Sequence, residues 1–292
     1  PEAVFVPPDF TRYKAASRQT REIFHRHTDL VEPLSLDEAY LDVTSNKTGL
    51  PTATAVAKAI RAQIREELQL TASAGVAPNK FLAKLASDVR KPDGLFVILP
   101  DEIDAFLPGL PVGRIPGVGK VTDAQLGALG IRTIGELREL SAGELERRFG
   151  KYGKRLYEFA RGIDDHPVVP NQPTQSISAE DTFERDQTLD AMESKIRGLA
   201  AKVWEAAQQE HRVPHTVVLK LKTHDFKVLT RSLTPQQMPA TAAELAEMAL
   251  SLRERVGRPA RSLYRLVGVG LSNFRDQDEA GERQPQLFQD QR

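Results

Sequence analysis

Two adjacent carboxylates, Asp37 and Glu38, stand between apolar runs in the segment Val-Glu-Pro-Leu-Ser-Leu-Asp-Glu-Ala-Tyr-Leu-Asp-Val at residues 31–43. Burying such a pair without a partner would be costly, so it needs a counter-ion. Hard cations such as Mg²⁺ bind carboxylate oxygens together with substrate phosphates, which makes the pair a candidate half of a metal site. The two carboxylates converge only if the backbone bends after Pro33, because neighbouring strand residues point to opposite faces. The alternative is a solvated hairpin tip.

A second group of candidate residues is basic. Residues 71–92 predict a strand that runs into a helix capped near Asn79. Lys80, Lys84 and Lys91 follow this cap, and each could contact phosphate as a point charge. Lysine on a helix face is, however, usually only solvated.

The elements that must position these residues form several predicted units. Residues 1–108 alternate short apolar runs with helical stretches, as expected for an α/β or α+β domain. Its strands are predicted at residues 3–6, 31–34, 38–43, 71–76 and 95–99, and its helices near 10–27, 54–68 and 79–89.

The rest of the chain predicts further units and an α+β multidomain protein. Residues 109–165 predict a small all-helical unit, and the turn-rich residues 166–175 predict a linker. Residues 176–276 predict a four-stranded sheet with two helices, in the order strand, helix, strand, strand, helix, strand. The polar residues 277–292 cannot bury a core and are expected to be disordered.

Composition sets the outer limits on function. Forty Lys and Arg residues balance forty Asp and Glu residues, so a nucleic-acid surface would have to be local. The absence of cysteine excludes disulfides and thiolate chemistry and fits a cytoplasmic protein. No apolar run approaches a membrane span, and the strand expected directly after Pro1 suggests a truncated N-terminus.

Three segments together resemble the Y-family lesion-bypass DNA polymerases. They are Ser-Leu-Asp-Glu-Ala-Tyr-Leu-Asp at residues 35–42, the Gly-to-Lys-Pro segment at 75–92 and Ile-Pro-Gly-Val-Gly at 115–119. The resemblance extends over essentially the whole chain in one collinear order. It implies a palm at 1–108, a thumb at 109–165 and a little finger at 176–276, working as a monomer.

The resemblance also implies roles for individual residues. Asp37 matches a metal-bridging aspartate, Glu38 its neighbouring catalytic glutamate, and Lys91 a lysine that contacts the incoming triphosphate. Tyr13 and Ser17 fall on a family pattern in the palm helix and are expected mainly to pack. The implied cofactors are two Mg²⁺ ions, and the implied partners are primer-template DNA and deoxynucleoside triphosphates.

One departure from the family matters for catalysis. Members open with a strand that carries another metal-binding aspartate, followed by a steric-gate aromatic residue and a fingers insertion, and none of these is found here. Asp9 and Asp29 lie in the wrong context to replace the aspartate. The polypeptide as printed is therefore expected to bind DNA without polymerising.

Two predicted DNA contacts lie outside the carboxylate segment. Residues 115–120 fit a helix-hairpin-helix in which Gly117 and Gly119 let backbone N–H groups approach a phosphate near Lys120, although a plain packing turn has the same sequence. In the third domain, Lys220 and Lys222 alternate on one strand face, with Lys227 and Arg231 following. This basic face could hold DNA, or it could be ordinary solvated lysine.

The tail carries a candidate docking peptide. Gln284, Leu287 and Phe288 set an apolar pair in a polar stretch and look like the bacterial sliding-clamp-binding peptide. Two other functions stay open at this point. One is a non-catalytic DNA- and clamp-binding module, and the other is a two-metal nuclease. The six histidines show no metal-ligand spacing and receive no role.

Overall fold

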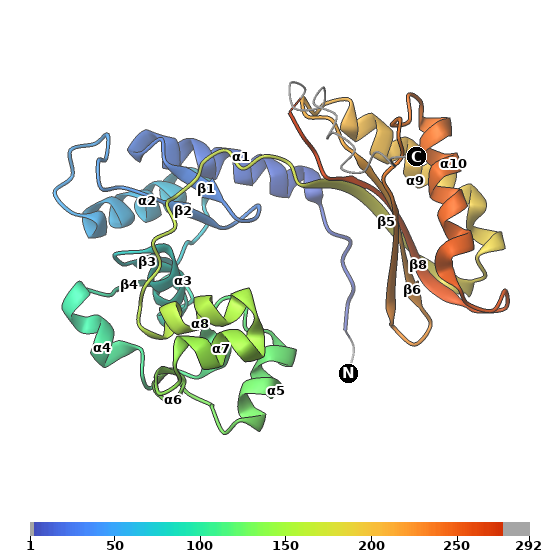
Figure 1. Cartoon of the computed structure of the whole chain (residues 1–292). Helices are drawn as coiled ribbons and strands as arrows, with labels where there is room; N and C mark the ends of the chain where they lie inside the picture. Colours follow the sequence, from blue (N-terminus) through green and yellow to red (C-terminus); the bar gives the residue numbers. More distant parts are fainter. Residues whose placement is uncertain (1–2, 277–292) are drawn as a thin grey trace, which may run out of the picture. The chain divides into compact units, whose positions relative to one another are not determined.

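The computed structural model describes residues 3–276, and these fall into two compact units, unit 1 up to Gln172 and unit 2 from Pro173 (Figure 1). The clamp-like residues Gln284, Leu287 and Phe288 lie outside the described residues. None of the helices in residues 3–276 combines the length and apolar character needed to cross a bilayer. Each unit is described by itself below.

The first part of unit 1 is a mixed α/β region. Its elements are α1 (Phe10–His27), β1 (Val31–Pro33), β2 (Ala39–Leu41), α2 (Ala53–Leu68), β3 (Ala74–Val76), α3 (Lys80–Val89), β4 (Leu95–Val97) and α4 (Ile103–Phe106). The three expected helices and four of the five expected strands are present. The strand expected at residues 3–6 is wrong. Val4, Phe5 and Val6 are 86%, 93% and 79% exposed, because no described strand lies beside them to supply a ladder.

The strands of this region form two separate pairs among the described residues. β1 pairs antiparallel with β2, and β3 pairs parallel with β4. Helices α1 and α2 bury a small core that consists of Ile23, Val56, Ile60 and Ile64. The helical period of these apolar residues explains why α2 forms and which of its faces is buried.

Helix α3 ties this region to the helices that follow it. The Asn79 side chain accepts a hydrogen bond from the N–H of Leu82 at 3.0 Å, which caps the helix start. Helices α5 (Lys120–Ala128), α6 (Ile134–Arg138), α7 (Ala142–Phe149) and α8 (Lys151–Ala160) complete the unit. Phe81 of α3 stacks on Phe159 of α8 with ring centroids 4.4 Å apart, inside one shared core.

Unit 2 is an antiparallel four-stranded sheet covered on one face by two helices (Figure 1). Its elements are β5 (Ser176–Gln187), α9 (Glu193–Ala207), β6 (Thr216–Thr223), β7 (Val228–Leu233), α10 (Ala242–Ser251) and β8 (Tyr264–Ser272). The strand order is β5-β8-β6-β7, and the predicted sequence of elements is confirmed. Burial alternates strictly along β6, so one face joins the core and the other is open.

Candidate active site and nucleic-acid contacts

The two predicted carboxylates lie at the tip of the β1–β2 hairpin. The N–H of Leu34 donates to the carbonyl of Glu38 at 2.9 Å and closes a bend over residues 34–38. Asp37 and Glu38 are both exposed on this bend. The backbone thus bends after Pro33, as convergence of the two side chains requires, and both carboxylates are accessible to a ligand.

Ser35 organises the hairpin tip. Its hydroxyl donates to Asp37 Oδ1 at 2.5 Å and accepts hydrogen bonds from the N–H groups of Asp37 and Glu38 at 3.2 and 3.1 Å. Such a side-chain turn fixes the backbone without a sheet partner. Sequence reasoning assigned Ser35 no role of its own, although the Ser-x-Asp spacing is typical of this local turn.

One lysine of the candidate site contacts a carboxylate, and a second lies within the field of both. Lys84, on α3, donates to Glu38 Oε1 at 2.6 Å. Lys91 pairs with Asp88 at 2.6 Å. The hydrogen bond to Asp88, helped by the charges of Glu38 and Asp37, raises the pKa of Lys91. The Lys91 ammonium therefore stays charged within the field of both carboxylates.

The donor set fits a hard cation together with a phosphate. Asp37 and Glu38 offer accessible carboxylate oxygens, and Lys91 adds a positive charge for an anion. Within residues 3–276, no group of three or more Asp, Glu, His or Cys side chains is placed to hold a metal ion. Two carboxylates carry two negative charges, whereas a pair of Mg²⁺ ions carries four positive ones.

A buried acidic residue beside this site was missed from the sequence. Glu32, on β1, is 4% exposed and accepts a 2.6 Å hydrogen bond from Lys80. Burial alone would raise the pKa of Glu32, but the hydrogen bonds from Lys80, Val169 and Gln172 outweigh it and lower that pKa. Burial, with the nearby charges of Asp164, Glu32 and Glu38, raises the pKa of Tyr40 to about 12. Glu32 and its hydrogen-bond partners lie far apart in the sequence, so no motif with a fixed spacing could have identified them.

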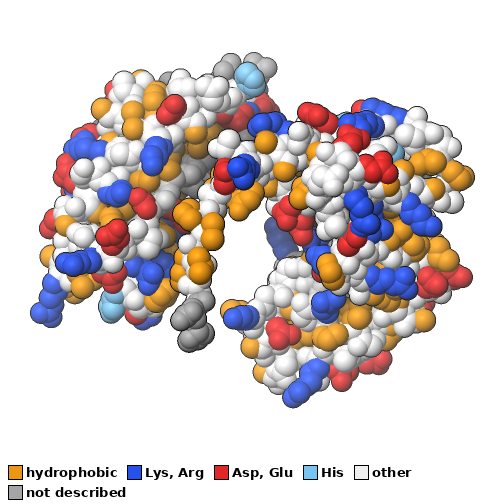
Figure 2. All heavy atoms as spheres, turned by 180° about the vertical axis from the view of Figure 1, so that it is seen from behind, with side chains coloured by type: hydrophobic (Ala, Val, Ile, Leu, Met, Phe, Trp, Pro, Cys, Tyr) orange, Lys and Arg blue, Asp and Glu red, His pale blue; other side chains and the backbone are white. Residues whose placement is uncertain are grey.

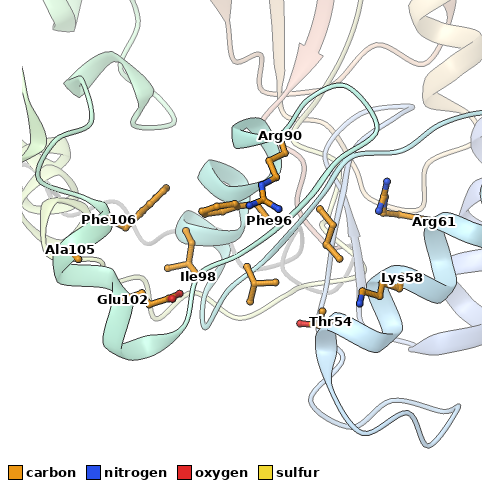
Figure 3. Close-up of a pocket in the computed structure, with 11 residues that line it drawn as sticks. Thr54, Lys58, Arg61, Arg90, Phe96, Ile98, Glu102, Ala105 and Phe106 are labelled. Carbon is orange, nitrogen blue, oxygen red and sulfur yellow. The ribbon is translucent and has the colours of Figure 1, made fainter.

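A separate hollow of about 800 Å³ opens elsewhere on unit 1 (Figure 3). Its lining includes Lys58, Arg61, Arg90, Phe96 and Phe106, and neither Asp37 nor Glu38 belongs to it. Arg61 is engaged there in holding the fold, since it donates to the carbonyls of Ala72 and Asp93 at 2.7 Å. The hollow is therefore distinct from the carboxylate site.

The predicted glycine hairpin precedes the N-terminus of α5. Gly117 has a φ of +93°, and a Cβ there would lie 2.8 Å from the Tyr152 hydroxyl, so both backbone angle and space require glycine. Gly119 is the N-cap of α5 and provides no side-chain cap. Lys120, the first residue of this helix, is exposed. An uncapped, exposed helix start is suited to a phosphate.

The open face of the unit 2 sheet carries Lys220 and Lys222, which are both partly engaged. Lys220 donates to Glu180 Oε2 at 2.6 Å. The Lys222 ammonium lies 5.1 Å from the ring centre of Phe226, whose other neighbour is Arg265 at 4.1 Å. This cluster of Lys222, Phe226 and Arg265 joins cations to an exposed aromatic ring, a combination suited to nucleic acid. Arg265 was not identified from the sequence.

Arg231 does not share the face of these lysines. It pairs in register with Leu219, a buried residue of the helix-covered face, whereas Lys220 pairs with Thr230. The Arg231 guanidinium donates to the carbonyls of Arg255 and Val256 at 2.5 and 3.0 Å. The expected continuation of the basic face through Arg231 is wrong, because the β6–β7 turn sets its orientation. Lys227 pairs with Asp225 at 2.8 Å.

Basic and acidic side chains are interspersed over the faces that Figure 2 shows for each unit. Over the whole chain, forty basic residues balance forty acidic ones. These faces therefore present individual charged side chains rather than a broad field of one sign.

Comparisons with known proteins give a consistent result along the chain. The impB/mucB/samB family matches residues 1–88, its C-terminal domain family matches residues 174–287, and the DNA polymerase-iota thumb domain family matches residues 113–164. DNA polymerase IV of Xanthomonas campestris pv. campestris is 62% identical over 288 residues, which cover 99% of this chain and 80% of the relative. DNA polymerase IV of Neisseria gonorrhoeae is 48% identical, with 94% and 78% covered.

Solved structures agree with the sequence relatives. A Y-family DNA polymerase chimera built on Dbh superposes with a TM-score of 0.83 at 29% identity and covers 94% of this chain and 79% of that one. An insertion ternary complex of Dbh DNA polymerase gives a TM-score of 0.61 at 28% identity, again with 94% and 79% covered.

Proposed function

This chain belongs to the impB/mucB/samB family of Y-family DNA polymerases, and we propose from this premise that Asp37 and Glu38 are its metal-binding carboxylates for nucleotidyl transfer. Family members are DNA-directed DNA polymerases that perform translesion synthesis. The observation that carries the proposal is the hairpin tip, where Ser35 and Lys84 hold two accessible carboxylates close to Lys91.

The residues of the site have complementary tasks in this proposal. Asp37 and Glu38 would hold Mg²⁺, and the metal would supply charge neutralisation at the triphosphate and a more acidic primer 3′ hydroxyl. Lys91 would bind the triphosphate of the incoming deoxynucleotide as a cation of raised pKa. Ser35 would keep the Asp37 carboxylate in one orientation.

We also propose that these two carboxylates require a third one. Two carboxylates supply few of the oxygen ligands that two octahedral Mg²⁺ ions take, and the resemblance to the family implies a further aspartate on an N-terminal strand. Among the described residues, β2 pairs only with β1 and β3 only with β4, so each pair has an edge that could accept such a strand. Without that further aspartate, the site is expected to bind DNA and to add no nucleotide.

DNA would be held at several sites along the chain. In this proposal residues 1–108 act as palm, 109–165 as thumb and 176–276 as little finger. Gly117, Gly119 and Lys120 contact phosphate through backbone N–H groups and a lysine, and Lys220 and Lys222 contact it from the open sheet face. These contacts grip the backbone and tolerate altered bases.

Replacing Lys220 and Lys222 together with Ala tests this DNA interface. Removing one lysine–phosphate interaction lowers the slope of log K against log salt by about 0.9, so the double variant should lose up to about two units of slope, equally on different DNA sequences. The measurement is a fluorescence-anisotropy titration of primer-template DNA at several salt concentrations. Lys202→Ala, on the exposed side of α9, is the control and should change nothing. An unaltered slope in the double variant would remove the open face from the interface.

The tail is proposed to bind a bacterial sliding clamp through Gln284, Leu287 and Phe288, which lie outside the described residues. A short apolar pair in a polar segment is the usual form of such a docking peptide. Deleting the residues after Gly281 should abolish binding to immobilised clamp in surface plasmon resonance, while DNA binding is retained. Clamp binding that survives the deletion would refute the assignment.

A further inference from the structure

Glu32 is a buried carboxylate that the proposed reaction does not use. Its side chain is 5% exposed, and a carboxylate in such surroundings needs a full set of partners. Three groups donate hydrogen bonds to it, namely Lys80 Nζ at 2.6 Å, the N–H of Val169 at 2.9 Å and Gln172 Nε2 at 3.0 Å. Two of these three donors come from a segment about 140 residues further along the chain.

Lys80 contacts the same distant segment. Besides Glu32, its ammonium donates to the carbonyl of Pro167 at 3.1 Å and lies 5.2 Å from the centre of the Tyr40 ring. Glu32 of β1 and Lys80 of α3 thus hold one stretch of chain, which they contact at residues 167, 169 and 172. All three contacts lie within unit 1.

The segment held in this way has no regular structure of its own. Residues 163–169 lie in neither helix nor strand, and Pro167 and Pro170 have no N–H to donate. The segment follows α8 and runs past β1 and β2 (Figure 1). Its start is fixed too, because Asp164 accepts a hydrogen bond from the N–H of Phe81 at 3.1 Å. Side chains of unit 1 therefore replace the backbone partners that a helix or strand would supply.

We propose that Glu32 and Lys80 anchor residues 167–172 to unit 1 and so confine the connection between the units to residues 173–175. On the other side, Arg212 of unit 2 donates to the carbonyl of Thr174 at 3.2 Å, which shortens the free connection further. Three residues span at most about 11 Å, whereas ten released residues, 166–175, would span about 36 Å. Glu32 and Lys80 are then positioning residues that limit how far the two units can separate.

Hydrogen exchange tests the anchor without using catalysis. In Glu32→Gln the side chain keeps its shape but loses the charge that pairs with Lys80, and the N–H of Val169 should exchange at least about a hundredfold faster than in the wild-type chain. Glu67→Ala is the matched control, because it removes an ion pair with Arg26 at 2.5 Å in the same unit without touching the segment. Exchange at Val169 should not change in this control.

Distances between the units give a second readout. The chain contains no cysteine, so spin labels at Lys58→Cys on α2 and Lys202→Cys on α9 form a single pair. Pulsed dipolar spectroscopy should give a distance distribution at least about twice as broad in Glu32→Gln and in Lys80→Met as in the labelled parent. Gln172→Ala leaves both anchor residues in place and should produce a smaller increase in both readouts. If Glu32→Gln and Lys80→Met do not fold, an increase in Gln172→Ala supports the anchor, and no change in either readout overturns it.

The affinity for DNA is a third readout, and it rests on the proposed function. Because effective concentration falls with roughly the −3/2 power of linker length, a change from three to ten free residues should weaken binding of DNA that contacts both units by roughly sixfold. A folded Glu32→Gln chain with wild-type Val169 exchange and an unchanged distance distribution would overturn the anchor. Faster exchange and a broader distribution with unchanged DNA affinity would support the anchor and count instead against DNA contact by both units.

Discussion

Replacing Asp37 with Asn is expected to slow nucleotide addition by about a thousandfold or more and to leave DNA affinity within about twofold. The variant belongs in a hybrid that joins the N-terminal part of the Xanthomonas campestris relative to this chain, so that the family's further aspartate is present. Asn keeps the size of the side chain but removes the charge that a hard cation requires. A loss of about 4 kcal/mol in transition-state stabilisation corresponds to that rate.

The control for Asp37 lies on the same hairpin. Asp42 follows β2, and its Oδ1 accepts a hydrogen bond from the N–H of Thr44 at 2.9 Å, which Asn can also accept. Asp42→Asn should therefore leave extension nearly unchanged. The rates are measured by single-turnover primer extension, and DNA affinity by anisotropy on the same samples. Equal rates in the Asp37 and Asp42 variants would exclude Asp37 from the chemistry.

Gly75→Ala is expected to destabilise unit 1 by about 3 kcal/mol or more, because it forces β3 away from α3. An added Cβ would lie 2.1 Å from the Ala83 carbonyl oxygen, 2.4 Å from the Ser87 nitrogen and 2.8 Å from the Ala86 Cβ. Two of these atoms belong to the helix backbone, which cannot rotate aside. Since α3 carries Lys84 and lies beside the carboxylate hairpin, the damage should reach the site.

Calorimetry separates this effect from a general loss of stability. The unfolding transition of unit 1 should fall by about 6–12 °C, whereas that of unit 2 should not move. Gly127→Ala is the matched control, since nothing lies within 4 Å of its added Cβ and the residue lies in α5. Alanine favours a helix, so this control should be neutral or slightly stabilising. Transitions that shift equally in Gly75→Ala and Gly127→Ala would refute the packing argument.

Much of the fold follows from local patterns in the sequence. The elements of unit 2 were predicted in the right order because its strands alternate and its helices have a clear apolar period. The carboxylate bend follows from Pro33 and the residues after it. The strand expected at residues 3–6 failed because a short apolar run alone does not supply a pairing partner.

The parts that sequence patterns missed depend on contacts across the fold. Arg231 was assigned to the basic face because it follows Lys220 and Lys222 along the chain, but the β6–β7 register pairs it with Leu219 of the opposite face. Glu32 lies inside an apolar-looking strand, and its partners Val169 and Gln172 are 137 and 140 residues away. The pairing of Lys84 with Glu38 likewise depends on how α3 packs near the hairpin.

Single-turnover primer extension with Mg²⁺ is the most direct test of the central claim, that Asp37 and Glu38 form part of a two-metal site that needs a further carboxylate. A polypeptide of the printed 292 residues should bind primer-template DNA and add no nucleotide, and the hybrid with the N-terminal part of the Xanthomonas relative should extend the primer. Robust nucleotide addition by the printed polypeptide alone would contradict the claim.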